Sequence, residues 1–512
     1  MRSLHSPNSW AIGSLVLFVG TLASRGLGFV RELAMAALFG TSAATDAWLM
    51  ASVVPNLLFS TVNAALANVV VPVLAHRREE PPRDDVLYVR EMVALVGGVT
   101  VGLTILAEAL APILVRLLAP GFADGQLQRT ILLTRIMLPT IIFWAGAGLA
   151  MGVLQARAIY APTSGAPVLV NLVRIATILI FGRLWGITGV AVGFVLAVAG
   201  QWLYLLPALT AQGFSLRPKW QIRDPRTRQT LRLTGPFLLT SGTGALGVLV
   251  DRILASSLPT GNIAALNYAF LLTQLPLGLL VNAVSLPGFT RLAEEWNAAQ
   301  RDLFGRVLQK TLELAQVIAV PSAVFLLFGA VPLVHLLYQR DAFTTHSTQL
   351  TAHVLTYWAL GLPAFAASIV LGRSLFALRA VRPMIAISTV TVACNIAGDL
   401  LLIHPLGAAG LAFATSIASW MAAGMTLYYL FHRRLLPDRF LSPTLVLRYA
   451  VAALLTVWAA RLAVVPLGAL LASGFGGRVL GLAALAGVGG AVWIGSLSGG
   501  HWIVSRRQAG RG

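Results

Sequence analysis

The chain has 512 residues, of which 57% are hydrophobic and only 11% are charged, with a net charge of +19. Soluble domains carry roughly a quarter charged residues, so this composition excludes a soluble globular protein and predicts a polytopic membrane protein. Cys394 is the only cysteine, which excludes an internal disulfide and argues against a thiolate metal site. No small-residue cleavage motif follows the long first apolar segment, so we expect that segment to be retained as a helix.

Apolar runs divide the chain into fourteen expected membrane-spanning helices, since each span needs about 20 mostly apolar residues. In chain order the expected ranges are 10–38, 47–75, 88–118, 129–156, 162–183, 187–211, 233–256, 263–290, 306–338, 349–378, 383–403, 408–431, 445–466 and 477–503. An even number of spans places both termini on the same side of the membrane.

The loops between these segments differ in charge. Loops that follow odd-numbered segments carry few Lys or Arg residues, and "FGTSAATDA" and "SSLPTGN" carry none. Loops that follow even-numbered segments and the tail are basic, with Arg77, Arg78, Arg83, Arg217, Lys219, Arg223, Arg226, Arg228, Arg232, Arg433, Arg434, Arg439, Arg506, Arg507 and Arg511. Cytoplasmic loops collect basic residues, so we expect the basic loops and both termini in the cytoplasm. The net charge is then mainly an orientation signal, and nucleic-acid binding is not expected.

Two halves of the sequence resemble each other at an offset near 220 residues. "VRELAMAALFGTSAATDAW" from Val30 matches "VDRILASSLPTGNIAALNY" from Val250, and "NLVRIATILIFGRLWGITGVAVGF" from Asn171 matches "NIAGDLLLIHPLGAAGLAF" from Asn395. "LQARAIYAPT" and "APILVRLLAPGF" have counterparts at the same offset. Matches in one order at one offset indicate a duplication.

Each repeat holds six expected helices, and an even number inserts both copies in the same orientation. The sequence therefore predicts an all-α fold of two six-helix lobes related by a pseudo-two-fold axis along the membrane normal, plus two C-terminal helices. We expect an N-lobe at 1–213, a basic cytoplasmic linker at 214–232, a C-lobe at 233–435, and the last two helices with a basic tail at 436–512. Two facing bundles create a central cavity, and rocking them gives alternating access.

Few charged residues fall inside the apolar segments, where such side chains usually mark function. They are Arg25, Arg31, Glu32, Glu108, Arg174, Asp251, Arg252, Arg373 and Asp399. Arg25 and Arg31 lie roughly 120° apart around their helix and about 9 Å apart along it, so both are able to flank one cavity. Glu32 follows Arg31 directly and is expected to point elsewhere. The two arginines are the best ligand candidates, because their helix leads into a polar loop with Asp46.

Other charges carry alternatives that the sequence leaves open. Asp251 and Arg252 are neighbours near the outer end of segment 233–256, where snorkelling to the interface competes with ligand binding. Arg174 and Asp399 occupy nearly matching repeat positions with opposite charge, so a pair between the lobes is one alternative. We treat these four residues as secondary cavity charges.

Motifs of catalysis are absent from the sequence. It has no Walker motif, dinucleotide-binding GxGxxG context, HExxH or GxSxG, and its histidines lack metal-ligand spacing. We therefore expect a transporter rather than an enzyme, with no cofactor. The energy then comes from an ion gradient, the membrane potential or the substrate gradient.

Several short motifs together resemble the MurJ/MviN family. They are "SRGLGFVRE", "ALFGTSAATDA", "VPNLL" and "VVVPVL" within residues 20–75, and "LAPGFADG" from Leu118. The resemblance implies a lipid II flippase of the multidrug/oligosaccharidyl-lipid/polysaccharide exporter superfamily, which moves an undecaprenyl-pyrophosphate-linked peptidoglycan precursor to the outer leaflet of the bacterial cytoplasmic membrane.

The resemblance also implies roles for particular residues. It implies substrate-binding roles for Arg25, Arg31 and Asp46, and a groove for the lipid tail formed by residues 445–503. A planar guanidinium suits a pyrophosphate, because it donates several hydrogen bonds in a fixed fork. Membrane lipids and cell-wall synthases are the implied partners.

The sequence departs from the family pattern at two positions where arginines are usual. These positions hold Phe59, in "PNLLFSTVNAALANVV", and Leu271, in "NYAFLLTQLP"; Arg252 or Arg174 would have to substitute for the missing cations. Three alternatives therefore stay beside lipid II: a flippase for another lipid-linked polysaccharide unit, a non-transporting scaffold that recruits envelope synthases, and a cation-coupled drug exporter. The cationic segment 10–38 argues against the exporter.

Overall fold

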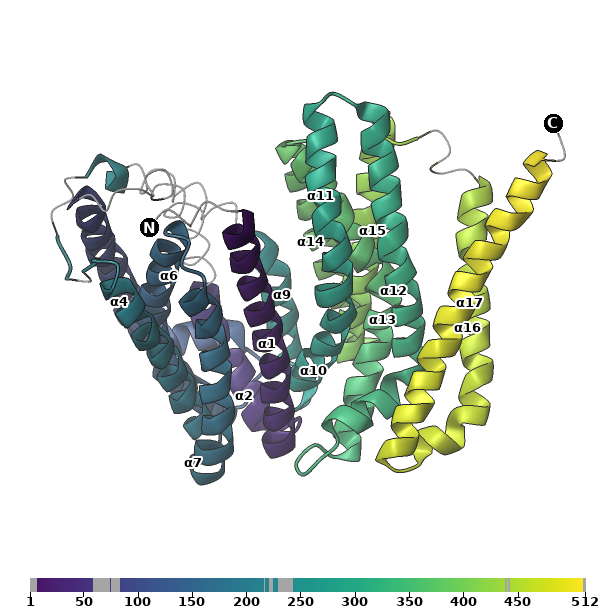
Figure 1. Ribbon diagram of the computed structural model, residues 1–512. Coiled ribbons are helices and arrows are strands. Elements are labelled where there is room, and N and C mark those ends of the chain that lie inside the picture. Colours follow the sequence, from purple (N-terminus) through teal and green to yellow (C-terminus); the bar gives the residue numbers. More distant parts are fainter. Residues whose placement is uncertain are drawn as a thin grey trace. The chain divides into compact units, whose positions relative to one another are not determined.

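The computed structural model describes residues 7–58, 74, 83–215, 217–220, 224–228, 243–437, 440 and 443–509, and throughout these ranges the regular secondary structure is helical (Figure 1). The chain forms two compact units, Met1–Gly261 and Asn262–Gly512. Each unit buries its apolar residues between helices, so each has a core of its own.

The first unit is built around one long helix. Its helices are α1 (Pro7–Phe39), α2 (Ala43–Ala51), α4 (Arg83–Leu118), α5 (Asp124–Met137), α6 (Thr140–Ala156), α7 (Ala161–Thr210) and α9 (Thr243–Ala255). Helix α7 packs against both α1 and α6, while α2 packs against α5. Tyr88, Met92, Val153 and Leu205 form part of a core between α4, α6 and α7.

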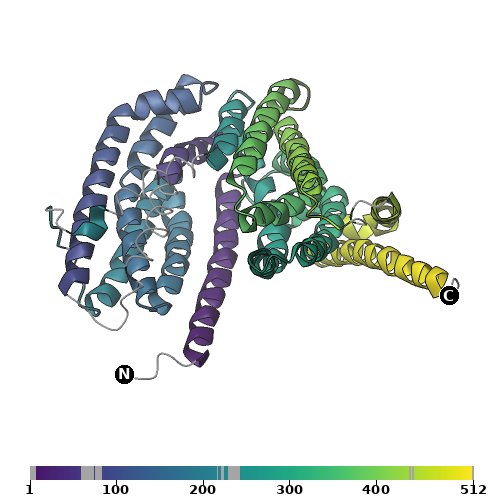
Figure 2. The ribbon, with the colours of Figure 1, turned by 90° about the horizontal axis from the view of Figure 1, so that it is seen from above.

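The second unit contains the remaining helices. They are α10 (Asn262–Leu275), the π-helical turn η1 (Pro276–Val281), α11 (Asn282–Asn297), α12 (Arg301–Tyr338), α13 (Thr345–Ala377), α14 (Val381–Leu406), α15 (Ala408–His432), α16 (Pro443–Ala472) and α17 (Phe475–Ala509). Helices α12, α13, α14 and α15 pack in succession, with α13 also against α15. Helices α16 and α17 lie side by side against α12, at the edge of this unit (Figure 2).

The expected spans coincide with these helices. Nine helices of the described residues are long and apolar enough to cross a membrane, or ten when the pair bent by 49° around η1 counts as one span. Helix α7 covers two expected spans, 162–183 and 187–211, which meet at Gly186. The expected spans 47–75 and 233–256 are described only in part, at 47–58 with residue 74, and from Thr243 onward. The prediction of an all-α polytopic membrane protein is confirmed.

The backbone repeats the duplication found in the sequence. Gly186, inside α7, has φ 62° and ψ −147°, and Gly407, which lies 221 residues later between α14 and α15, has φ 60° and ψ −136°. Two further left-handed turns recur at the same spacing, at Ala158 and Arg379 and at Gly213 and Arg434. The recurrence supports an internal repeat in which corresponding helices end with the same turn.

The chain after α7 returns to the first unit through a network of buried charges. Asp85 Oδ2 accepts a hydrogen bond from Arg157 (2.9 Å) and Asp85 Oδ1 accepts one from Arg226 (2.6 Å). Arg226 also pairs with Asp224, whose backbone N–H donates to Glu91. Burial raises the pKa of the Asp224 carboxyl, but the hydrogen bonds and charge of Arg226 outweigh it and hold that pKa below its usual value. This network fixes part of the expected linker 214–232 to the unit.

Helix α9, which was expected to begin the C-lobe, belongs to the first compact unit. Arg252 Nη1 donates to the carbonyl oxygen of Leu49 in α2 at 3.0 Å. Gly121 N–H donates to Ser256 Oγ at 3.3 Å, just beyond the end of α9. These polar contacts explain why the compact units divide at Gly261 rather than in the linker.

Close approach of two helices explains a glycine that recurs with the duplication. A Cβ added to Gly410 in α15 would lie 2.2 Å from the backbone oxygen of Leu402 in α14, and one added to Gly189 would lie equally close to the oxygen of Phe181. Both contacts are far inside van der Waals distance and involve backbone that cannot rotate away. Glycine at these positions allows the helices that flank Gly186 and Gly407 to pack tightly.

We expect Gly410→Ala to destabilise the protein by roughly 1–3 kcal/mol, the usual cost of overpacking, seen as a lower unfolding temperature in detergent. The matched control is Gly424→Ala in the same helix, where an added Cβ meets nothing within 4 Å. If both variants unfold at the same temperature as the unmodified protein, the close α14–α15 contact does not contribute to stability.

Candidate substrate site

Arg31 lies at the contact between α1 and α7 in the first unit. Its Nη1 donates to Asn171 Oδ1 of α7 at 3.0 Å, and its Nε and Nη2 both donate to Glu32 Oε1, at 3.1 and 2.5 Å. The expectation that Glu32 points away is therefore wrong. Adjacent Cα positions are separated by 100° on a helix, but both side chains are long and flexible enough to fold back and meet beside α7.

Asn171 positions this arginine, and the sequence prediction did not include it as a site residue. The side chain is 8% exposed, and its amide nitrogen donates to the backbone oxygen and Oγ of Ser24 and to the backbone oxygen of Pro167, at 3.0–3.1 Å. With both donors used in this way, its oxygen is directed to Arg31. One side chain therefore joins α1 to α7 and sets the orientation of the guanidinium.

Arg174, one turn after Asn171 in α7, is held by aromatic rings. Its guanidinium carbon lies 4.6 Å from the ring centre of Phe194 and 5.8 Å from that of Trp48. Trp48 and Trp144 each make an edge contact with Phe194. A cation over aromatic faces is stabilised without a carboxylate, and Arg174 lies within electrostatic range of Arg31 and Glu32.

Arg25 has a different environment from Arg31, although both belong to α1. Its side chain is exposed within the first unit, six residues before Arg31. A Cβ added to the following residue, Gly26, would meet nothing within 4 Å, so α1 is open at Gly26. The structure thus places one accessible arginine and one oriented arginine along a single helix.

Asp46 lies elsewhere, in the first turn of α2. It is 2% exposed, and its Oδ2 accepts a hydrogen bond from the backbone N–H of Gly261 at 2.6 Å. Arg252 contacts the same helix through Leu49, and Asp251 precedes it in α9. These three predicted residues therefore form a group around α2 and α9, next to the loops that connect the helices.

The remaining predicted charge, Asp399, belongs to the second unit. It is fully buried in α14, where its Oδ2 accepts from Asn395 Nδ2 at 3.0 Å. Arg373 of α13 donates to Asn282 Oδ1 at 2.9 Å in the same unit. Arg174 and Asp399 are thus each engaged by side chains of their own unit.

One signal in the sequence points to a residue that was missed. The matching repeat segments both begin with asparagine, Asn171 and Asn395, and in each unit that asparagine holds a charged side chain. The aromatic residues around Arg174 come from α2, α6 and α7 and share no pattern in the sequence. Among the described residues, no group of three His, Cys, Asp or Glu side chains is arranged to hold a metal ion.

Solved structures with this fold are transporters. One titled "Lipid II flippase MurJ, inward closed conformation" matches with a TM-score of 0.77 at 21% identity, covering 94% of this chain and 99% of that chain. An inward-facing multidrug resistance MATE family transporter of the MOP superfamily matches with a TM-score of 0.68 at 15% identity, covering 80% of this chain and 93% of that one. The chain shares the fold of these two transporters.

Sequence comparison defines the family within this class. The family model described as "Lipid II flippase MurJ" matches residues 35–474. A probable lipid II flippase MurJ of Rhizobium meliloti is 30% identical over 420 residues, covering 79% of this chain and 77% of the relative; one of Haemophilus influenzae is 28% identical over 433 residues, covering 80% and 83%. The chain belongs to the MurJ family of lipid II flippases, so the expected resemblance is confirmed, and the family consists of transporters rather than enzymes.

We expect Asn171→Ala to reduce transport of the physiological cargo by about tenfold, because the loss of an oriented, charge-assisted hydrogen bond typically costs 1.5–3 kcal/mol. Transport is measured in vesicles at equal amounts of inserted protein. Asn171→Asp, which keeps an acceptor for Arg31, should retain more activity than the alanine variant. Equal activity of the alanine variant and the unmodified protein would show that Arg31 needs no orientation by α7.

Proposed function

We propose that this protein flips an undecaprenyl-pyrophosphate-linked peptidoglycan precursor, lipid II, from the inner to the outer leaflet of the bacterial cytoplasmic membrane by alternating access. The observation that carries the proposal is the oriented Arg31 with Arg174 beside it, in a chain of the MurJ family. Arg25 and Arg31 bind the pyrophosphate, and Asp46 takes part in the substrate site as the family pattern implies.

The geometry of Arg31 suits this role. A guanidinium has five N–H donors, and the hydrogen bonds that Arg31 makes within the described residues use three of them. Two donors remain for phosphate oxygens, which bind guanidinium strongly in a low-dielectric site. Glu32 and Asn171 keep the side chain in place when the cargo is absent, so little ordering is needed when it binds.

Arg174 is the proposed substitute for the cations missing from the family pattern. Phe59 lies outside the described residues, and Leu271 is a partly buried residue of α10 that brings no charge. Arg174 lies within electrostatic range of Arg31, whereas Arg252 donates a hydrogen bond to the backbone of α2. Arg31 and Arg174, both in the first unit, would then provide positive charge that the family pattern places on other helices.

The proposed topology, lipid-tail region, energy source and partners of the protein are those expected from its sequence. Both termini and the basic loops lie in the cytoplasm, the lobes comprise residues 1–213 and 233–435 joined by the linker 214–232, and residues 436–512 add the last two helices. Within that last region, residues 445–503, in α16 and α17, hold the lipid tail of the cargo. An ion gradient, the membrane potential or the cargo gradient supplies the energy, and cell-wall synthases are the expected protein partners.

We expect Arg31→Ala and Arg25→Ala each to abolish rescue of cells depleted of their own lipid II flippase, because each removes a cation that binds the pyrophosphate. Colony counts should fall by at least a factor of ten. The control is Arg183→Ala, an exposed arginine of α7 in the same unit, and immunoblots of membranes confirm equal insertion. Stable unmodified protein that gives neither rescue nor lipid II translocation would contradict the proposed function.

We expect Leu271→Arg to increase lipid II transport if the uncharged residue at this position limits the present activity. A second cargo is tested in parallel, a lipid-linked polysaccharide unit that lacks the peptide. If the unmodified protein transports this cargo better and Leu271→Arg reverses the preference, another lipid-linked glycan is the natural substrate. Leu271→Met serves as the uncharged control and should leave both rates unchanged.

A further inference from the structure

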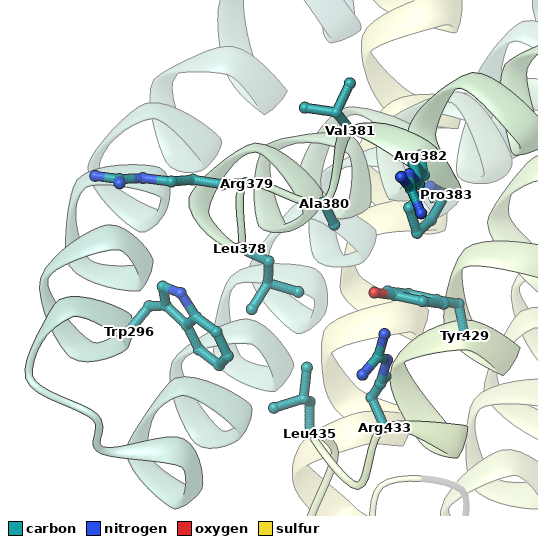
Figure 3. A pocket seen from close by; sticks show the side chains of 10 residues that line it. All are labelled: Trp296, Leu378, Arg379, Ala380, Val381, Arg382, Pro383, Tyr429, Arg433 and Leu435. Carbon is teal, nitrogen blue, oxygen red and sulfur yellow. The ribbon is translucent and has the colours of Figure 1, made fainter.

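A basic cavity lies at one end of the second unit, whereas the arginines proposed to bind the cargo belong to the first unit. It has a volume of about 580 Å³ and opens where α13 ends, α14 begins and α15 ends. None of its lining residues is acidic, and the polar and aromatic ones are Trp296, Arg379, Arg382, Tyr429 and Arg433 (Figure 3). The cavity therefore offers positive charge together with a hydroxyl group.

Three side chains of this cavity converge. Figure 3 shows Arg433 and the hydroxyl of Tyr429 pointing into the space between the helices, with Arg382 next to them and Arg379 extending away. The Arg433 guanidinium lies 5.6 Å from the centre of the Tyr429 ring. Within the part of the chain that the structure describes, neither Arg382 nor Arg433 pairs with a carboxylate. Two guanidinium groups thus face the cavity without a carboxylate partner among the described residues.

The beginning of α14 adds to this positive charge. The helix starts at Val381, and its N-cap residue, Ala380, makes no side-chain capping bond. The helix dipole places partial positive charge at such an end and favours an anion there. Ala380 and Val381 both line the cavity, so the positive end of the helix and the two arginines face the same space.

The end of α6 in the first unit corresponds to the end of α13, which borders the cavity. Arg157 ends α6 as Leu378 ends α13, 221 residues later, and Arg157 is neutralised by Asp85 and covered by Phe214 at 5.3 Å. At the same spacing, Asp85 corresponds to Arg306 and Phe214 to Leu435.

Asp85 therefore neutralises this end of the first unit, whereas the described residues at the corresponding end of the second unit provide no such carboxylate. After Phe214 the chain folds back and supplies Asp224 and Arg226 to the first unit, whereas after Leu435 it continues to α16. Among the described residues of the second unit no carboxylate pairs with Arg382 or Arg433, so an anionic ligand is able to supply the matching charge.

An apolar groove adjoins the cavity. It measures about 530 Å³, lies between α14 and α15, and is lined by Pro383, Ala386, Ile387, Gly424, Met425, Tyr428 and Tyr429. Pro383 and Tyr429 line both spaces, and both helices are candidate membrane spans. A ligand that fits the two spaces together has an anionic head at the helix ends and an apolar chain along the spans.

We propose that this cavity binds the phosphate of an anionic phospholipid, with one acyl chain in the groove between α14 and α15. Arg382 and Arg433 contact the phosphate, the Tyr429 hydroxyl donates to it, and the start of α14 adds its dipole. With the orientation proposed above, the site lies at the cytoplasmic leaflet. Its residues belong to the second unit alone and are separate from Arg25 and Arg31.

Native mass spectrometry of the full-length protein in detergent tests this site, with dioleoyl phosphatidylglycerol and dioleoyl phosphatidylcholine as probes. We expect the protein to retain phosphatidylglycerol preferentially, and the double variant Arg382→Gln/Arg433→Gln to weaken its binding by about tenfold or more. Arg434→Gln removes the same charge from the adjacent position, which does not line the cavity, and should change binding less than twofold.

Gly424→Trp tests the groove without changing charge, since the space beside Gly424 is open. We expect this variant to lose phosphatidylglycerol while its unfolding temperature stays the same, so the test holds even if the double variant does not fold. Equal binding of the two lipids, or full retention by the double variant or by Gly424→Trp, would overturn the proposal. Displacement of the lipid by millimolar inorganic phosphate would instead indicate a site for a free anion. Competition by the lipid-linked cargo that requires Arg382 would assign the site to the cargo.

Discussion

A guanidinium inside an apolar helix must find its partners in the protein, because the hydrocarbon of the bilayer supplies none. Asn171 satisfies this requirement for Arg31: its amide group is tied to α1, and its oxygen accepts from the guanidinium. The same contact joins α1 to the long helix α7. Asn171 therefore contributes both to the packing of α1 on α7 and to the placement of the charge, and the cation that the proposed function needs is also part of the helix interface.

Charge near Arg31 is balanced without removing its capacity to bind an anion. Glu32 contributes one carboxylate, whereas Arg174 is stabilised by Phe194 and Trp48 rather than by a second acid. Aromatic faces stabilise a cation without neutralising it. Two arginines and one carboxylate place more basic than acidic groups in this region, which suits the proposed binding of a pyrophosphate.

The two repeats have kept their backbone and changed their electrostatics. Turns at Gly186 and Gly407 share one conformation, and corresponding glycines allow the same close helix contact. At the end of the first unit, Asp85 pairs with Arg157 and Arg226, while the described residues that line the cavity at the matching end of the second unit include arginines and no carboxylate. Duplication supplied the same helix ends twice, and divergence of a few side chains gave them different chemistry.

The sequence by itself determined the helical spans, the duplication and the family, and it singled out Arg31 as a candidate ligand-binding residue. Apolar length, charge pattern and local motifs are all properties of residues close together along the chain. Phe59 and part of the linker lie outside the described residues, so those predictions stay as the sequence made them. Only the tertiary structure decided that Glu32 turns toward Arg31, that Asn171 orients it, and that Arg382 and Arg433 share a cavity. These features depend on side-chain direction and on helices distant in sequence, and neither is set by the order of residues along one helix.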